Sequence, residues 1–253
     1  MPEPLEEWLR PHFDRSVGRP FLFYVAYGKT PDDFAISRSR YKFGGVPDGL
    51  EISAYGPTSS PETVDDFRTG YLWDRLRDED EKLAGEIGVQ DQCLIIRGTL
   101  DDAPNLNYLR DVTGLVEWMF DSGIVAVFDP QAFRWWSKTN WHQQLFEAGR
   151  SGLHSHVSIL QSDESNGTWL HTRGMRKFGR PDLSVRHVPA PSVKDAASLV
   201  NRFIEFQALG GVIEDGKAIR VSGLPEGMTC RLGGDVDDPD FNNTHAEIVW
   251  PRG

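Results

Sequence analysis

Residues 91–129, DQCLIIRGTLDDAPNLNYLRDVTGLVEWMFDSGIVAVFD, carry the clearest fold signal in the chain. The apolar runs 91–100 and 124–129 each predict a buried strand. Between them, Pro104 can begin a helix whose apolar residues recur at helical spacing as far as about Asp121. Such a strand–helix–strand unit usually places its two strands parallel, with a right-handed crossover.

Two strands and a helical region are predicted upstream of this unit. Residues 21–28 form a short apolar and aromatic run that ends in glycine, and residues 49–55 alternate weakly, so both predict strands. Helix formers dominate from 62 to 87, where we expect an imperfect amphipathic helix with a break at Gly70.

The segment from Pro130 to Ala148 is predicted to be another helix, and it is rich in aromatic residues. On a helix, Trp135 and Trp136 would point about 100° apart, so they cannot share one buried stripe with Trp141. We therefore expect at least one of these three tryptophans to be partly exposed, where it could anchor a partner.

The periodicity changes from helical to alternating near Gly152. The new pattern predicts strands at 153–161, 168–175, 182–188 and around 217–222, 228–232 and 244–250, with a helix over 193–209. The whole chain is therefore expected to be an α+β protein with a mixed sheet system, helices packed mainly on one side, and strands concentrated after residue 150.

Two interpretations of the domain organisation fit the sequence. In the first, residues 1–90 form an N-terminal region of unknown affiliation, packed on an α+β domain of residues 91–253. In the second, residues 1–253 form a single continuous domain. A boundary near Ala148–Gly152 fits the change of periodicity, but no linker marks it.

The charge balance favours one class of partner. The 253 residues carry 27 Lys and Arg against 38 Asp and Glu, a net charge of −11. This field repels nucleic acids and anionic membranes and favours a basic protein partner. No secretory signal and no membrane span is recognisable, so we expect a cytoplasmic protein with reduced thiols at Cys93 and Cys230.

The familiar catalytic and cofactor-binding signatures are missing from the sequence. It contains no phosphate-binding G-x-x-x-x-G-K-[ST] loop, no G-x-G-x-x-G fingerprint, no G-x-S-x-G elbow and no H-E-x-x-H helix. Two cysteines also exclude a four-cysteine zinc site. We therefore predict no catalytic residue and no cofactor.

One group of histidines offers an alternative. His154 and His156 lie two residues apart on a predicted strand, which would place both side chains on one face. His171 lies on the next predicted strand and would face them if the two strands pair. Three imidazoles on one face could bind Zn²⁺, Ni²⁺ or Fe²⁺, as in a metal-dependent enzyme. Ordinary half-exposed strand histidines are the competing interpretation.

Residues 172–183, TRGMRKFGRPDL, form a basic island in this acidic chain. Anion recognition and a glycine-kinked connection between two strands both fit the composition. The run resembles the T-x-G-[LM]-x-x-[FY]-G-x-x-[DE]-[LIV] core of a family of uncharacterised bacterial proteins that carry a domain of unknown function. The resemblance extends over roughly 91–222. It implies an α+β fold without assigned catalytic residues, and a loose association with immunity or accessory proteins of toxin systems.

These observations lead to one main functional hypothesis and two alternatives. We expect a non-enzymatic, immunity-type cytoplasmic binding protein that neutralises a basic toxin or effector by occlusion. Its contact surface would include the acidic run 78–81, an exposed tryptophan among Trp135, Trp136 and Trp141, and the loop carboxylates of Asp235, Asp237, Asp238 and Asp240. The alternatives are the metal-dependent enzyme and a structural scaffold protein.

Overall fold

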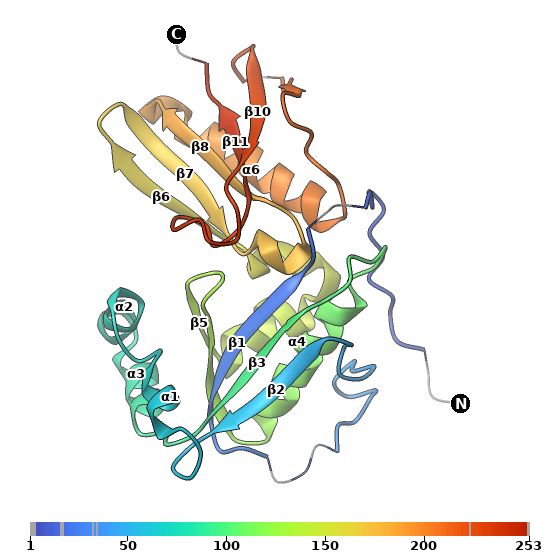
Figure 1. Ribbon diagram of the computed structural model, residues 1–253, viewed down its shortest axis with the longest axis vertical. Coiled ribbons are helices and arrows are strands. Elements are labelled where there is room, and N and C mark those ends of the chain that lie inside the picture. Colours follow the sequence, from blue (N-terminus) through green and yellow to red (C-terminus); the bar gives the residue numbers. More distant parts are fainter. Residues whose placement is uncertain (1–3, 16–17, 32, 34, 223, 252–253) are drawn as a thin grey trace. The chain divides into compact units, whose positions relative to one another are not determined.

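The computed structural model describes residues 4–15, 18–31, 33, 35–222 and 224–251. The chain forms two compact units (Figure 1). The first consists of Met1–Leu9, Phe21–Leu100 and Asn105–Gly152, and the second of Arg10–Pro20, Asp101–Pro104 and Leu153–Gly253. The α+β class is confirmed, since each unit has its own sheet and its own helices.

The first unit contains a sheet in which every neighbouring pair of strands is antiparallel. Its order is β2 (Leu50–Tyr55), β3 (Cys93–Thr99), β1 (Phe21–Gly28), β4 (Ile124–Asp129) and β5 (Arg134–Ser137). Strands from residues 1–90 and from residues 91–253, which only the first of the two domain interpretations separates, therefore lie in one sheet.

The strand–helix–strand unit of residues 91–129 is confirmed. It consists of β3, α4 (Asn107–Asp121) and β4. Strands β3 and β4 are each antiparallel to β1, which lies between them, so they run parallel to one another as predicted. The central strand comes from far upstream in the chain, which local periodicity does not reveal.

Helices cover both faces of this first sheet. The region 62–87 folds as three short helices rather than one, namely α1 (Pro61–Asp65), α2 (Tyr71–Glu79) and α3 (Glu81–Gly88). Gly70, with φ 76°, precedes α2, and the Asp80 side chain caps α3 by accepting from the Leu83 amide. These helices pack on the face that carries Val25 and Tyr27.

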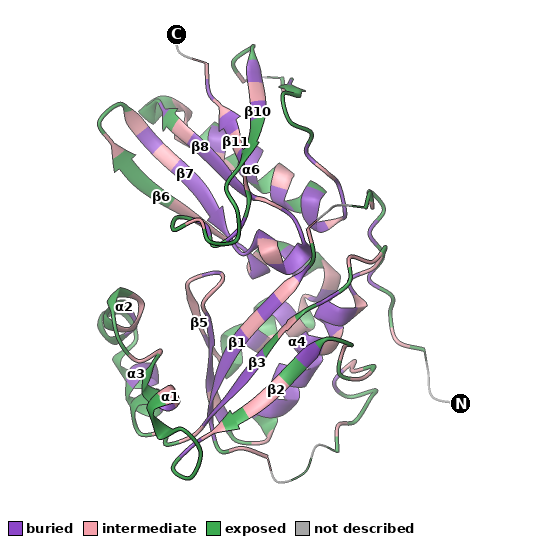
Figure 2. Cartoon of the chain, in the orientation of Figure 1, coloured by how far each residue is buried: buried purple, intermediate pink, exposed green. Residues whose placement is uncertain are grey.

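Helix α4 packs on the opposite face of the first sheet, where the Tyr24 ring meets Trp141. Helices lie on both sides because both faces of the inner strands are apolar, as the run of buried residues along β1 shows (Figure 2). The expectation of helices mainly on one side therefore does not describe this sheet.

The second unit contains a mixed sheet. Its order is β6 (Ser158–Glu164), β7 (Gly167–Arg173), β8 (Asp182–Val188), β11 (His245–Val249), β10 (Met228–Gly233) and β9 (Ala218–Ile219). The β8–β11 pair is parallel and the other pairs are antiparallel. Helix α6 (Val193–Ala208) packs against β7 and β8 (Figure 1). The alternating strands and the helix predicted after residue 157 are confirmed.

Two predicted segments are wrong. Residues 153–156 belong to a 3-10 helix, η2 (Gly149–His156), and the strand begins only at Ser158. The predicted helix 130–148 is replaced by β5, α5 (Lys138–Trp141) and the π-helix η1 (His142–Glu147). Pairing of β5 with β4 accounts for this change, because aromatic residues suit a half-buried strand and tertiary contacts override a helical pattern.

A membrane span is not found in the described residues, since none of their helices combines sufficient length with sufficient apolar character.

Candidate functional site

The acidic loop, residues 234–244, connects β10 to β11 and contains all four aspartates predicted as partner-binding residues. Its own side chains shape it. The Asp235 carboxylate accepts a hydrogen bond of 2.8 Å from the Asp237 amide. The Asp238 carboxylate accepts bonds of 2.9 and 3.2 Å from the amides of Asp240 and Phe241. These carboxylates build consecutive turns, as aspartates commonly do in loops.

An aromatic anchor fixes the acidic loop to the sheet of the second unit. The buried Phe241 ring stacks on His245 at 4.6 Å between centroids. It also meets the rings of Trp169 and His171 edge-on, at 6.2 and 5.8 Å. Because Trp169 and His171 are two residues apart on β7, both side chains lie on the same face of the sheet. The loop therefore covers part of the face that lies opposite α6.

Polar contacts hold the same end of the acidic loop. The Asn243 side-chain amide donates to the Arg180 carbonyl at 2.9 Å and to the Asp182 carboxylate at 2.8 Å. Arg176 donates to the Asn242 carbonyl at 3.1 Å, and the Arg173 guanidinium donates to the Asp240 carbonyl. The loop is thus attached to residues of the segment 172–183.

Asp182 is the buried centre of this attachment. Its carboxylate accepts from the Thr172 hydroxyl at 2.8 Å and from the Met175 amide at 3.2 Å, in addition to Asn243. Burial raises the pKa of Asp182 to about 6, against the lowering effect of these hydrogen bonds and of Arg173. The protonated form is therefore stabilised inside the fold relative to an exposed aspartate.

The basic island 172–183 is a structural connection between β7 and β8. Gly174 and Gly179 adopt φ values of 120° and 65°, at the two ends of the 3-10 turn η3 (Met175–Phe178). Lys177 is fully buried and donates to the His156 carbonyl at 2.7 Å. The buried cations of the segment 172–183 therefore donate to backbone carbonyls. The interpretation as a glycine-kinked connection describes the segment better than the interpretation as an exposed anion-binding site.

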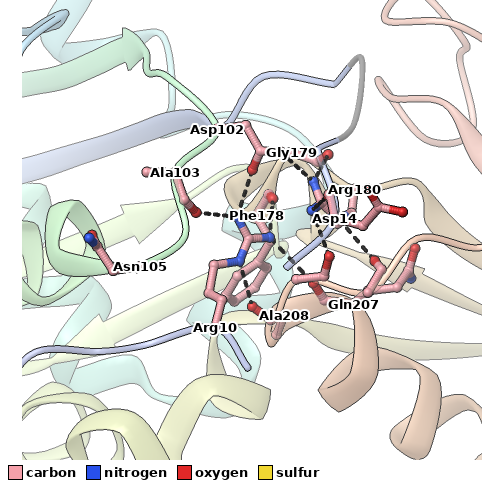
Figure 3. Close-up of polar contacts among 12 residues, drawn as sticks. Arg10, Asp14, Asp102, Ala103, Asn105, Phe178, Gly179, Arg180, Gln207 and Ala208 are labelled. Atoms are coloured by element: carbon pink, nitrogen blue, oxygen red, sulfur yellow. Dashed lines mark hydrogen bonds and ion pairs between the residues drawn. The ribbon is translucent and has the colours of Figure 1, made fainter. Parts of the chain in front are cut away.

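Arg180 extends this network to the N-terminal part of the second unit (Figure 3). Asp102 accepts from Arg180 at 3.0 Å and from Arg10 at 2.6 Å, and the side chains of both arginines are fully buried. Arg10 also donates to the carbonyls of Ala103, Phe178 and Ala208, and Arg180 to those of Asp14, Gly210 and Gly211. This cluster holds the C-terminal end of η3 at Phe178. Arg180 and Asp182, which bind Asn243 of the acidic loop, follow directly in the chain.

Of the three tryptophans predicted as anchors, Trp135 is partly exposed, as expected of at least one of them, and the other two are buried. Trp136 and Trp141 retain 1% and 0% of their surface, which corrects their assignment to a contact surface. Trp135 is half-buried and stacks on Phe128 at 4.4 Å between centroids. Strand geometry explains the burial, because Trp135 and Trp136 point to opposite faces of a sheet that helices cover on both sides. The acidic run 78–81 is exposed, on α2 and α3 of the first unit.

The three histidines of the metal hypothesis do not form a ligand set. His154 is exposed on η2, and the buried His156 ring lies against Phe178. His171 lies opposite Leu160 in the strand pairing and stacks on Trp169 at 3.9 Å. Burial lowers the pKa of His171 to about 4. In the described part of the chain, no group of three or more His, Cys, Asp or Glu side chains is arranged to hold a metal ion.

Sequence reasoning missed the residues that hold the acidic loop in place, namely Phe241, Asn243, Trp169 and Asp182. The run DPDFNN predicts turns by its composition. Nothing local in the sequence pairs Asn243 with Asp182, which lies 61 positions away.

Comparisons with known proteins add no relative to this description. No family model, no curated protein and no solved structure significantly matches the chain.

Proposed function

We propose that the protein is a non-enzymatic binding protein that neutralises a basic protein partner by covering it with an acidic surface. The observation that carries this proposal is the acidic loop, which presents exposed Asp235 and Asp237 while its other end is anchored by buried groups. A loop ordered before binding loses less conformational entropy when the complex forms.

Exposure and ion pairing favour two of the four loop aspartates as contact residues in this proposal. Asp238 is only 18% exposed and its carboxylate builds the turn, so we assign it to loop shape. The Asp240 carboxylate lies 3.9 Å from Arg186, which partly offsets its charge. Asp235 and Asp237 are therefore the carboxylates best placed to meet a cationic partner.

Two sequence features support a toxin or effector as the basic partner. The net charge of −11 favours rapid encounter with a basic protein such as a toxin or effector. The resemblance of residues 172–183 to bacterial proteins associated with toxin immunity suggests the same class. On this proposal the protein acts in the cytoplasm, where such a partner would be made or delivered.

The test uses basic proteins encoded beside this chain's gene, expressed singly and immobilised for surface plasmon resonance. The proposal expects one of them to bind, with an association rate that falls several-fold between low and 0.5 M salt. Changing Asp235 and Asp237 together to asparagine should slow association at low salt more than it speeds dissociation.

The matched control removes the same two charges elsewhere in the second unit. Glu205→Gln with Glu226→Gln changes two exposed carboxylates outside the acidic loop. If this control slows association as much as the loop variant does, net charge alone acts and the loop is not the contact surface. If no neighbouring basic protein binds, the immunity-type function is wrong.

A further inference from the structure

The first unit contains a pocket of about 510 Å³ that shares no lining residue with the acidic loop or its anchors. It is formed by residues 40–41 of the β1–β2 connection, by the C-terminal half of α4, and by α5 and η1. Its lining residues are Arg40, Tyr41, Glu117, Asp121, Lys138, Thr139, His142, Gln143 and Phe146. The π-helical geometry of η1 is itself uncommon and is found frequently at functional sites.

Two carboxylates one helical turn apart form the fixed wall of this pocket. Glu117 and Asp121 lie on the same face of α4, with side chains only 7% and 22% exposed. One Glu117 oxygen, Oε1, lies 2.8 Å from Nδ1 of His142. The other, Oε2, is buried, and no described residue offers it a hydrogen-bond donor. A buried carboxylate oxygen without a donor is costly, so a ligand that supplies one would be favoured.

The cations around the pocket are exposed and loosely held, in contrast to this wall. Asp121 accepts from Arg40 at 2.5 Å, from Lys138 at 2.7 Å and from the Tyr41 hydroxyl at 2.9 Å. The side chains of Arg40 and Lys138 are 67% and 54% exposed. Exposed ion pairs of this kind contribute little free energy, so a competing cation can displace either side chain.

The aromatic rings of the pocket already contact cations of the chain itself. The Arg40 guanidinium lies 5.0 Å from the centroid of Tyr41, and Lys42 Nζ lies 4.6 Å from that of Phe146. Carboxylates combined with aromatic faces are the groups that recognise ammonium and guanidinium ions. The chain's own Arg40 and Lys42 therefore already make the cation–aromatic contacts that a cationic ligand would make in this pocket.

We propose that this pocket is a binding site for an organic cation, a primary ammonium or guanidinium group held by Glu117 and Asp121 beside Tyr41 and Phe146. An anionic ligand fits less well, because Arg40 and Lys138 can move away whereas the buried Glu117 carboxylate cannot. The cation could belong to a free small molecule or to a lysine or arginine side chain. The site is in the other unit from the acidic loop and does not depend on the proposed function.

The test titrates the whole protein with n-butylammonium, with n-butylguanidinium and with a blocked tetralysine peptide, followed by NMR. Saturable shifts of the His142 ring protons are expected with at least one probe, and butyrate at equal concentration should produce none. Binding of the small cations assigns the site to free ligands as well as side chains. Binding of the peptide alone assigns it to a protein side chain.

Two variants then decide the sign of the charge that the pocket prefers. Lys138→Ala should strengthen binding of the cation about threefold or more, because it removes a competitor for Asp121. An anion site would respond in the opposite direction. Lys82→Ala removes a lysine charge from α3 whose side chain is 88% exposed, against 54% for Lys138, and should change binding much less. Equal effects of the two lysine variants would overturn the proposal, as would weaker binding after Lys138→Ala.

Glu117→Gln tests the buried carboxylate directly. It should weaken binding of the same probe about tenfold, whereas Glu62→Gln, an exposed change on α1, should leave it nearly unchanged. Circular dichroism establishes that the variant is folded, and the Lys138→Ala result decides the proposal if it is not. Unchanged affinity in folded Glu117→Gln protein would contradict the assignment.

Discussion

Thr172 and Asp182 lie on neighbouring strands of the second unit and share a buried hydrogen bond of 2.8 Å. The Thr172 hydroxyl donates to the carboxylate and accepts from the Leu183 amide, also at 2.8 Å. This pair closes the connection between β7 and β8 and positions Asp182 to receive Asn243 of the acidic loop. The segment 172–183 therefore has a structural task that its composition alone does not disclose.

The pH dependence of stability should reveal Asp182. Its pKa is raised to about 6 by burial, above the value of about 3.9 for an unfolded aspartate. The folded state then binds more protons, so this group's stabilisation is full below about pH 4 and is lost as the pH rises to about 6. The contribution is on the order of 3 kcal/mol, at about 1.4 kcal/mol per pKa unit.

Denaturant unfolding of wild type and Asp182→Asn between pH 4 and pH 7 measures this contribution. The stability of the wild type relative to the variant should fall across that interval. A difference that stays constant over the whole interval would show that Asp182 is ionised throughout in the folded protein.

Removing a charge from the buried ion cluster of Figure 3 should reduce the free energy of unfolding far more than removing one from the neighbouring exposed pair of Arg19 and Asp101. Asp102→Asn leaves two fully buried arginines with less compensation, so we expect the free energy of unfolding to fall by about 3–5 kcal/mol. Asp101→Asn, at the adjacent position, breaks an exposed pair with Arg19 and should cost at most about 1 kcal/mol. Urea denaturation of both variants tests this, and similar costs would contradict the buried assignment.

Two glycine-to-alanine changes in helices of the first unit should have opposite signs. A Cβ at Gly114 of α4 would lie 1.9 Å from the Tyr41 carbonyl oxygen, so Gly114→Ala should destabilise the protein by about 1–3 kcal/mol. No atom lies within 4 Å of a Cβ at Gly85 of α3, so Gly85→Ala should stabilise it by about 0.5–1 kcal/mol. Thermal and urea denaturation measure both, and stabilisation by Gly114→Ala would refute the close approach.

Asp237 and Asp238 are adjacent in the acidic loop, but their substitutions should affect stability differently. Asp238→Ala removes the acceptor of two backbone amides and should cost about 1 kcal/mol of stability. Asp237→Ala changes an exposed carboxylate and should alter stability by less than about 0.5 kcal/mol. Differential scanning calorimetry compares the two variants. Equal melting temperatures would show that Asp238 is dispensable for the turn.

The sequence by itself determined the fold class and most of the strands. Alternation of apolar residues in 182–188 and the apolar run 91–100 are local patterns, and local patterns specify which face of an element is buried. The helix 193–209 was equally clear because apolar spacing and the glycines that end it agree. The acidic loop was found in the sequence because its charges and turn residues are adjacent.

The tertiary structure alone decided where charged and aromatic side chains lie. By composition, Arg180 and Lys177 belong to a basic island, and cations in such a segment are usually exposed. They are buried because backbone carbonyls and Asp102, 78 residues from Arg180, complete their hydrogen bonds. Trp136 lies in strand β5 instead of the predicted helix because its segment pairs with β4. The pocket at Glu117 is assembled from segments with no shared sequence pattern. Such outcomes depend on long-range contacts, and periodicity along the chain carries no information about them.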